Sequence, residues 1–287
     1  VPEWDRVLSF ASHWADEDRS YSGKVDNIWL EFDMDTVTAE PSPSFFFGPI
    51  GMNSSFSDHG HAGFNRDDFV EIAPILFTHG GNADFVETVC RVCDALPGDA
   101  YCFQAGAMLS RPLPALRLCV RDIACDAILP YLQNIGWRGP RDELEELLGL
   151  VRGHVDRIDL DFDAVMRETV EIGPKIGLEL YRDDCYAADS DASRVLLDVL
   201  VEKGLCLPSK RDGLVEYPGI LNECDSRDVW PEHLLLSSML GGMNRISAFI
   251  FAVHHIKLVV ADDAIPEAKA YLAVFHEWIS VQPDDRR

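Results

Sequence analysis

Polar and apolar residues alternate strictly along the stretch 174–182. A period of two residues predicts a β-strand with two unlike faces, because successive side chains of a strand point to opposite sides. The two sets are Ile176, Leu178 and Leu180 on the apolar face, and Lys175, Gly177, Glu179 and Tyr181 on the polar face.

The same alternation recurs in five further stretches, at 27–34, 116–121, 157–163, 255–260 and 269–275. One such strand is typical of a half-buried sheet whose charged face meets water. The chain has only six lysines, however, and three of them, Lys175, Lys257 and Lys269, fall on these polar faces. We therefore predict that the polar faces together form an enclosed, positively charged lining.

The remaining stretches indicate helices, further strands and one long loop. Apolar residues at helical spacing predict helices at about 2–16, 66–78, 82–96, 124–136, 141–153, 192–203 and 228–240. Strands are predicted at 45–47, 101–109 and 245–253, an irregular or stranded segment at 206–217, and a loop at 48–65.

Strand pairs alternate with helix pairs in this order, which is an αββα unit repeated four or five times. Strands joined by tight turns are antiparallel. About ten such strands, with their apolar faces toward an outer ring of helices, close into a barrel whose polar faces line a lumen. We predict an α+β fold of this kind, a closed antiparallel barrel ringed by helices, as a single domain over 1–287.

Length and hydropathy fit one large domain and give no sign of a membrane segment. The chain has 287 residues, of which 47% are apolar, and these suffice for one large core or two ordinary domains. No run of about 18 apolar residues is present, so no membrane span is expected. The start is acidic and lacks a basic and then apolar leader, which predicts no targeting segment.

Eight cysteines are scattered along the chain, and the one C-x-x-C pair, Cys90 and Cys93, lies inside a helical pattern. Without a second pair at zinc-finger spacing, free thiols in a reducing cytoplasm are the expected state. The formal net charge of -24 argues against a nucleic-acid or anionic-membrane surface. A phosphate ligand would therefore depend on a local positive field, and one close ion pair contributes about 4 kcal/mol at an effective dielectric constant near 20.

Four segments resemble motifs of one enzyme family. They are 29–33 (Trp-Leu-Glu-Phe-Asp), the strand from Lys175 to Tyr181, the segment 204–218 with its Lys-Arg and Tyr-Pro, and 267–271 (Glu-Ala-Lys-Ala-Tyr). With the αββα order, they resemble the aromatic prenyltransferases of the ABBA type, the prenyltransferase barrel. The resemblance implies a natural-product enzyme that transfers a dimethylallyl or geranyl group from its diphosphate to an aromatic or peptide acceptor.

The resemblance also implies roles for particular residues. Glu31 would orient the acceptor or take its proton, and Tyr181 and Tyr271 would shield the allylic cation. The diphosphate ligands would be Arg117, Lys175, Arg211, Lys257 and Lys269, and the acceptor pocket would include Trp29, Glu179, Tyr217 and His255. No metal site is implied, and magnesium is possible but not required.

Three other interpretations stay open. The charges of the polar faces could pair across neighbouring strands, for example Lys175 or Lys257 with Glu179 or Asp161. A cyclase of isoprenoid chemistry could use Glu31 or the aspartates of the lumen to protonate its substrate. A barrel without catalytic activity could bind a small hydrophobic ligand.

Two short motifs are weaker candidates. The segment 67–71 (Asp-Asp-Phe-Val-Glu) resembles the Asp-rich motif of class I isoprenoid synthases, which binds a diphosphate through magnesium, but acidic residues are routine in a first helical turn. His59 and His61 could contribute to a metal site, although no third ligand lies near them in the sequence.

Overall fold

The computed structural model describes the greater part of the chain. The described residues are 2–16, 24–32, 41–49, 72, 83–111, 113, 115–182, 191–227, 229–240, 245–262 and 266–280. Most of the predicted 48–65 loop and of the predicted helix at 66–78 lies outside these ranges, as do His59, His61 and the segment 67–71.

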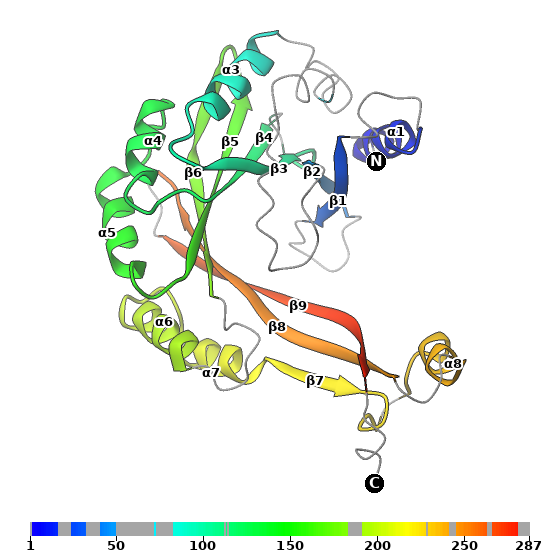
Figure 1. Ribbon diagram of the computed structural model, residues 1–287. Helices are drawn as coiled ribbons and strands as arrows, with labels where there is room; N and C mark the ends of the chain where they lie inside the picture. The colour runs from blue at the N-terminus through cyan, green and yellow to red at the C-terminus, as the bar shows by residue number, and fades with distance from the viewer. Residues whose placement is uncertain are drawn as a thin grey trace. The chain divides into compact units, whose positions relative to one another are not determined.

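Helices and strands follow each other in the predicted α+β order (Figure 1). The helices are α1 (Pro2–Trp14), α3 (Ala83–Asp94), α4 (Ile128–Asn134), α5 (Arg141–Val151), α6 (Asp191–Glu202), α7 (Pro208–Glu216) and α8 (Glu232–Leu240). The strands are β1 (Val25–Phe32), β2 (Pro43–Pro49), β3 (Tyr101–Ala107), β4 (Ala115–Arg121), β5 (Arg157–Met166), β6 (Val170–Tyr181), β7 (Gly219–Asn222), β8 (Arg245–Val260) and β9 (Glu267–Ser280).

Two predictions about single elements are wrong. The segment 206–217 contains helix α7 rather than a strand, and Pro208 explains its start: proline at the first helical position fixes φ where the missing N–H is not needed. The predicted strands at 245–253 and 255–260 are one continuous strand, β8. The doublet His254-His255 marks no break, because both residues lie within β8.

The nine strands form one sheet in the order β1-β2-β3-β4-β5-β6-β8-β7, and β9 also pairs with β8. The pairs β1·β2, β2·β3, β3·β4, β4·β5 and β7·β8 are antiparallel. Among the strands that the structure describes, no pairing joins β1 to β7 or β9. The antiparallel sheet is thus shown, whereas its closure into a barrel is not confirmed.

The chain divides into two compact units. Unit 1 contains residues 1–149, 158–179 and 259–266, and unit 2 contains residues 150–157, 180–258 and 267–287. Strands β5, β6 and β8 contribute residues to both units. The prediction of a single domain over 1–287 stays a prediction.

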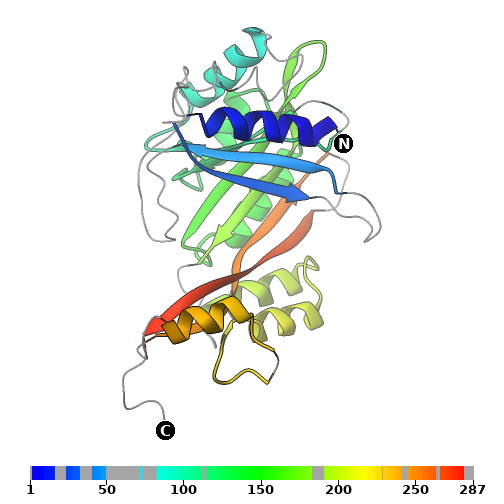
Figure 2. The ribbon, with the colours of Figure 1, turned by 90° about the vertical axis from the view of Figure 1, so that its right-hand side faces the viewer.

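Helices cover the apolar face of the strands in unit 1, as the alternation predicts. Figure 2 shows α1 lying across β1 and β2, and the ring of Phe10 packs 4.6 Å from the ring of Phe45. On β5, Phe162 meets Tyr131 of α4 at a ring separation of 6.1 Å. The opposite faces of the same strands carry the polar residues that are considered below.

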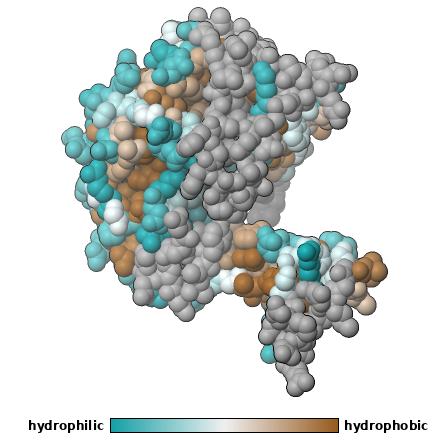
Figure 3. Space-filling model, in the orientation of Figure 1, coloured by the Kyte–Doolittle hydropathy of each residue, from teal (hydrophilic) through white to brown (hydrophobic). Residues whose placement is uncertain are grey.

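In unit 2, side chains from two other parts of the chain contact Ser247 of β8. Trp230 donates a hydrogen bond from Nε1 to the Ser247 hydroxyl of β8 over 3.0 Å, and His276 of β9 lies 2.9 Å from the same oxygen. Exposed apolar side chains gather on α8 and β7, among them Met239, Leu240 and Ile220 (Figure 3). No described helix of the chain is both long enough and apolar enough to cross a membrane.

Candidate functional site

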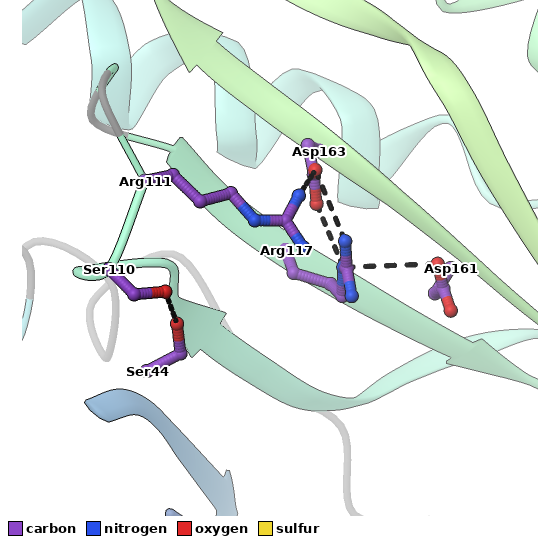
Figure 4. A network of polar contacts seen from close by, with 6 residues as sticks. All are labelled: Ser44, Ser110, Arg111, Arg117, Asp161 and Asp163. Atoms are coloured by element: carbon purple, nitrogen blue, oxygen red, sulfur yellow. Dashed lines mark hydrogen bonds and ion pairs between the residues drawn. The ribbon is translucent and has the colours of Figure 1, made fainter. Parts of the chain in front are cut away.

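The polar face of unit 1 carries a buried network of charges between β4 and β5 (Figure 4). Arg117 lies opposite Asp163 in the strand register, and its guanidinium donates two hydrogen bonds to the Asp163 carboxylate, over 2.8 and 3.2 Å. Arg111 donates to the same carboxylate over 2.9 Å, and Asp161 lies 3.8 Å from Arg117 Nε. The Arg117 side chain is almost fully buried.

Arg117 keeps its charge because acidic neighbours surround it. Burial by itself would lower the pKa of Arg117, but the charges of Asp161 and Asp163, together with the hydrogen bonds to Asp163, raise it above its usual value. The next pair along the strands repeats the arrangement: Arg121 donates to Asp159 over 3.1 Å and lies over the Phe103 ring.

For Arg117, this network shows the pairing of charges across neighbouring strands that was one of the open interpretations of the sequence. A diphosphate at Arg117 would have to displace Asp163 from a bidentate contact, which is a strong and specific geometry. The assignment of Arg117 to the diphosphate stays a prediction. Asp163 and Arg111 were missed by sequence reasoning, although the register of the β4 and β5 alternations offered a signal for Asp163.

The other predicted residues of unit 1 are less enclosed. Trp29 is 61% exposed and donates from its indole to Asn27 over 3.0 Å. Glu31 is half-buried opposite Ser44 of β2, and Glu179 is half-buried on β6. Lys175 is exposed, so it does not belong to an enclosed lining.

In unit 2 the structure brings three predicted site residues together, Tyr181, His255 and Tyr271, with His254 as a fourth member. The imidazole of His255 stacks on the Tyr271 ring at a centroid separation of 4.3 Å and an angle of 15°, and it lies 5.0 Å from the Tyr181 ring. His254 lies edge-on to Tyr181, and its Nδ1 is 2.7 Å from Nδ1 of His255. We call Tyr181, His254, His255 and Tyr271 the aromatic cluster.

Two cations lie against the faces of these rings. The ammonium of Lys257 lies 5.9 Å from the Tyr271 ring centroid, and the Arg157 guanidinium lies 4.1 Å from that of Tyr181. Lys257 is only 6% exposed, which makes it the buried member of the predicted lysine set. The aromatic cluster therefore combines electron-rich phenol rings with fixed positive charge, a combination that favours cations over the ring faces and anions beside the lysine.

The remaining predicted residues of unit 2 lie outside the aromatic cluster. Arg211 of α7 is paired with Asp198 of α6 and with Asp212, and hydrogen bonding to Asp212 raises its pKa. Lys269 is half-exposed and lies 3.5 Å from Glu267. Tyr217 packs edge-on against Phe251 at 5.9 Å. Of the three lysines on the predicted polar faces, Lys257 is thus buried, whereas Lys175 and Lys269 are exposed to solvent, and an enclosed lining stays a prediction.

The comparisons with known proteins do not assign the chain to a family. No protein-family model matches it, and neither a curated protein nor a solved structure does. Within the described ranges, no group of three or more His, Cys, Asp or Glu side chains is placed to hold a metal ion.

Proposed function

We propose that the chain is a prenyltransferase that moves an allylic isoprenoid group from its diphosphate to an aromatic or peptide acceptor. The observation that carries this proposal is the aromatic cluster, in which Tyr181 and Tyr271 flank His255 and the buried Lys257 lies against Tyr271. Prenyl transfer needs these two elements together: a positive group for the leaving anion and aromatic faces for the carbocation.

In this reaction the bond between the allylic carbon and the diphosphate oxygen breaks, and the acceptor attacks the carbocation. Lys257 would stabilise the leaving diphosphate, and the faces of Tyr181 and Tyr271 would stabilise the cation until it is captured, by up to about 2 kcal/mol for each desolvated contact. The acceptor then loses a proton. Glu31 is the residue that we propose for orienting the acceptor or taking that proton.

We further propose that the sheet closes into a barrel. Strand β1, which begins the pairing order, carries the exposed apolar side chain of Trp29, and β9, which pairs with β8 off that path, carries those of Leu272 and Val274. Long apolar edges are a liability for aggregation that proteins usually cover or pair, and closure removes them. A closed lumen would also keep water from the allylic cation.

The decisive experiment measures binding of a non-hydrolysable dimethylallyl diphosphate analogue by calorimetry, with magnesium and with a chelator. We expect binding in both conditions and a loss of at least tenfold in affinity for Lys257→Met, because this change removes the charge and keeps the apolar stem. Lys203→Ala, which changes an exposed lysine just after α6 and outside the proposed site, is the matched control and should bind as the wild type does.

Turnover is then assayed by mass spectrometry with dimethylallyl and geranyl diphosphate and a panel of indoles, phenols and short aromatic peptides. The proposal predicts a prenylated product that Lys257→Met reduces and Lys203→Ala preserves. An unchanged affinity in Lys257→Met, or no binding of any allylic diphosphate, would show that the lysine serves only the packing of β8 and β9.

A further inference from the structure

A second feature of unit 2 is a small pocket between β8 and the helix pair α6 and α7. Its volume is ≈ 50 Å³, and most of its lining is aliphatic. The apolar lining residues are Leu180, Leu196, Leu197, Leu214, Val215, Pro218, Val253 and Ile256. The pocket shares His254 and His255 with the aromatic cluster, and its remaining walls come from α6, α7 and neighbouring residues of β6 and β8.

The polar lining of the pocket is one-sided in charge. Arg182, Ser193 and the two histidines are its only polar lining residues among those that the structure describes, and none of them is acidic. In a chain with 49 acidic residues and a net charge of -24, a concave surface without a carboxylate is unusual. Outside the lining, the carboxylate of Asp156 lies 3.9 Å from Arg182 Nη2.

Local hydrogen bonds hold these polar groups in place. Arg182 Nη1 donates to the His154 carbonyl over 2.9 Å, and this hydrogen bond holds the guanidinium in place. The contact between the Nδ1 atoms of His254 and His255 requires that one donates and the other accepts. When His255 donates, the proton of His254 is at Nε2, where it serves as a hydrogen-bond donor.

We propose that this pocket binds a short apolar carboxylate of about four or five carbon atoms. The volume of ≈ 50 Å³ limits the size, because one water already needs roughly 10–15 Å³ and only a small ligand therefore fits. The aliphatic walls select a hydrocarbon tail, and Arg182, with support from Ser193 and His254, selects a negative head group. This proposal does not depend on the proposed prenyl transfer.

The test is a calorimetric or saturation-transfer NMR titration of the full chain with sodium 3-methylbutanoate at constant ionic strength. We expect saturable binding with a millimolar Kd, as befits so small a ligand. The neutral isostere 3-methylbutan-1-ol and the cation 3-methylbutylammonium should each bind at least tenfold more weakly. Equal binding of the alcohol and the carboxylate would overturn the assignment of charge.

Two variants separate the head-group contact from the tail contact. Arg182→Gln should weaken carboxylate binding at least tenfold, and Val215→Phe should abolish it by filling the pocket. Arg194→Gln is the matched control, because it removes an exposed arginine of α6 that is not part of the lining, and it should bind as the wild type does. The proposal fails if the wild type shows no saturable binding, or if folded Val215→Phe binds the carboxylate unchanged.

Discussion

Arg117 carries a positive charge in the interior of unit 1, and its guanidinium donates two hydrogen bonds to the carboxylate of Asp163 on the neighbouring strand. Taking both ions out of water costs several kcal/mol per ion, and the bidentate contact offsets much of that cost only while both partners are present. Arg111 shares the same carboxylate but is partly exposed, with 27% of its side chain accessible to water. Arg117 and Arg111 contact the same aspartate, but their removal should therefore change the stability of the fold to different extents.

We predict that Arg117→Met lowers the free energy of unfolding by about 3–5 kcal/mol, since it leaves Asp163 and Asp161 buried without their main partner. Arg111→Met should cost no more than about 1 kcal/mol, because a partly exposed pair contributes little. The double variant Arg117→Met with Asp163→Leu should recover much of the loss. Urea unfolding of the three variants measures these differences.

The pH dependence of that loss follows from the sign of the pKa shift. Because the pKa of Arg117 is raised in the folded state, its charge contributes a stability that is fully present at any pH below the pKa of arginine in the unfolded chain. That pKa lies far above neutral pH. The titration of Arg117 should therefore leave the difference in free energy of unfolding between the wild type and Arg117→Met constant between pH 6 and 9. A stable Arg117→Met, equal to Arg111→Met in its unfolding midpoint, would contradict the assigned role of the pair.

At the same scale, the sequence identified the two-faced strands but not the partners on them. The alternation placed Lys257 and His255 on one face of β8, and the structure finds both against Tyr271. It could not show that Lys175 is exposed, because the period of a strand defines its faces and not what covers them. The pairing of Arg117 needed the register between β4 and β5, which comes from tertiary contacts.

Elements were predicted best where the apolar periodicity extends over many residues, and worst in the short helix α7, which begins with a proline. Helices α3 and α6 lie close to their predicted ranges, whereas α7 was missed because its nine residues, Pro208–Glu216, carry no clear apolar stripe. The ion pairs of Arg211 with Asp198 and Asp212, which only the folded structure reveals, tie α7 to α6. Sequence periodicity has no access to such contacts.

Glycines offer a prediction at the scale of the element, because two of them sit in opposite surroundings. A Cβ added at Gly106 of β3 would lie 2.3 Å from the buried ring of Phe46, whereas nothing lies within 4 Å of a Cβ added at Gly149 of α5. Gly106→Ala should lower the free energy of unfolding by about 1–3 kcal/mol through overpacking. Gly149→Ala should raise it by about 0.5–1 kcal/mol, because alanine loses less backbone entropy in a helix.

Denaturant unfolding followed by circular dichroism measures both glycine variants under the same conditions. The two changes add the same methyl group, so the comparison isolates its surroundings. A shift of the same sign in both variants would mean that Phe46 does not rest on Gly106 as the structure shows. The pair would then report on the unfolded chain rather than on the strand.

For the whole molecule, the charge and the sheet edges matter more than any one contact. A net charge of -24 makes the chain repel itself, and this self-repulsion opposes compaction. Closure of the sheet is the step that periodicity could suggest and pairing order does not confirm. It depends on long-range contacts between the first and the last strands of the chain, which no local pattern determines.

Residue-resolved hydrogen exchange tests this closure. In an open sheet, β1 pairs only with β2, so the amides that point away from β2 exchange fast while their neighbours exchange slowly. In a closed barrel all amides of β1 between Ile28 and Glu31 are paired, and we predict uniformly slow exchange there and in β9. Strand β4 is the internal control, because it pairs with β3 and β5 and should be protected in either case. Fast exchange at every second amide of β1 would rule out closure, and prenyl transfer would then need another means of excluding water.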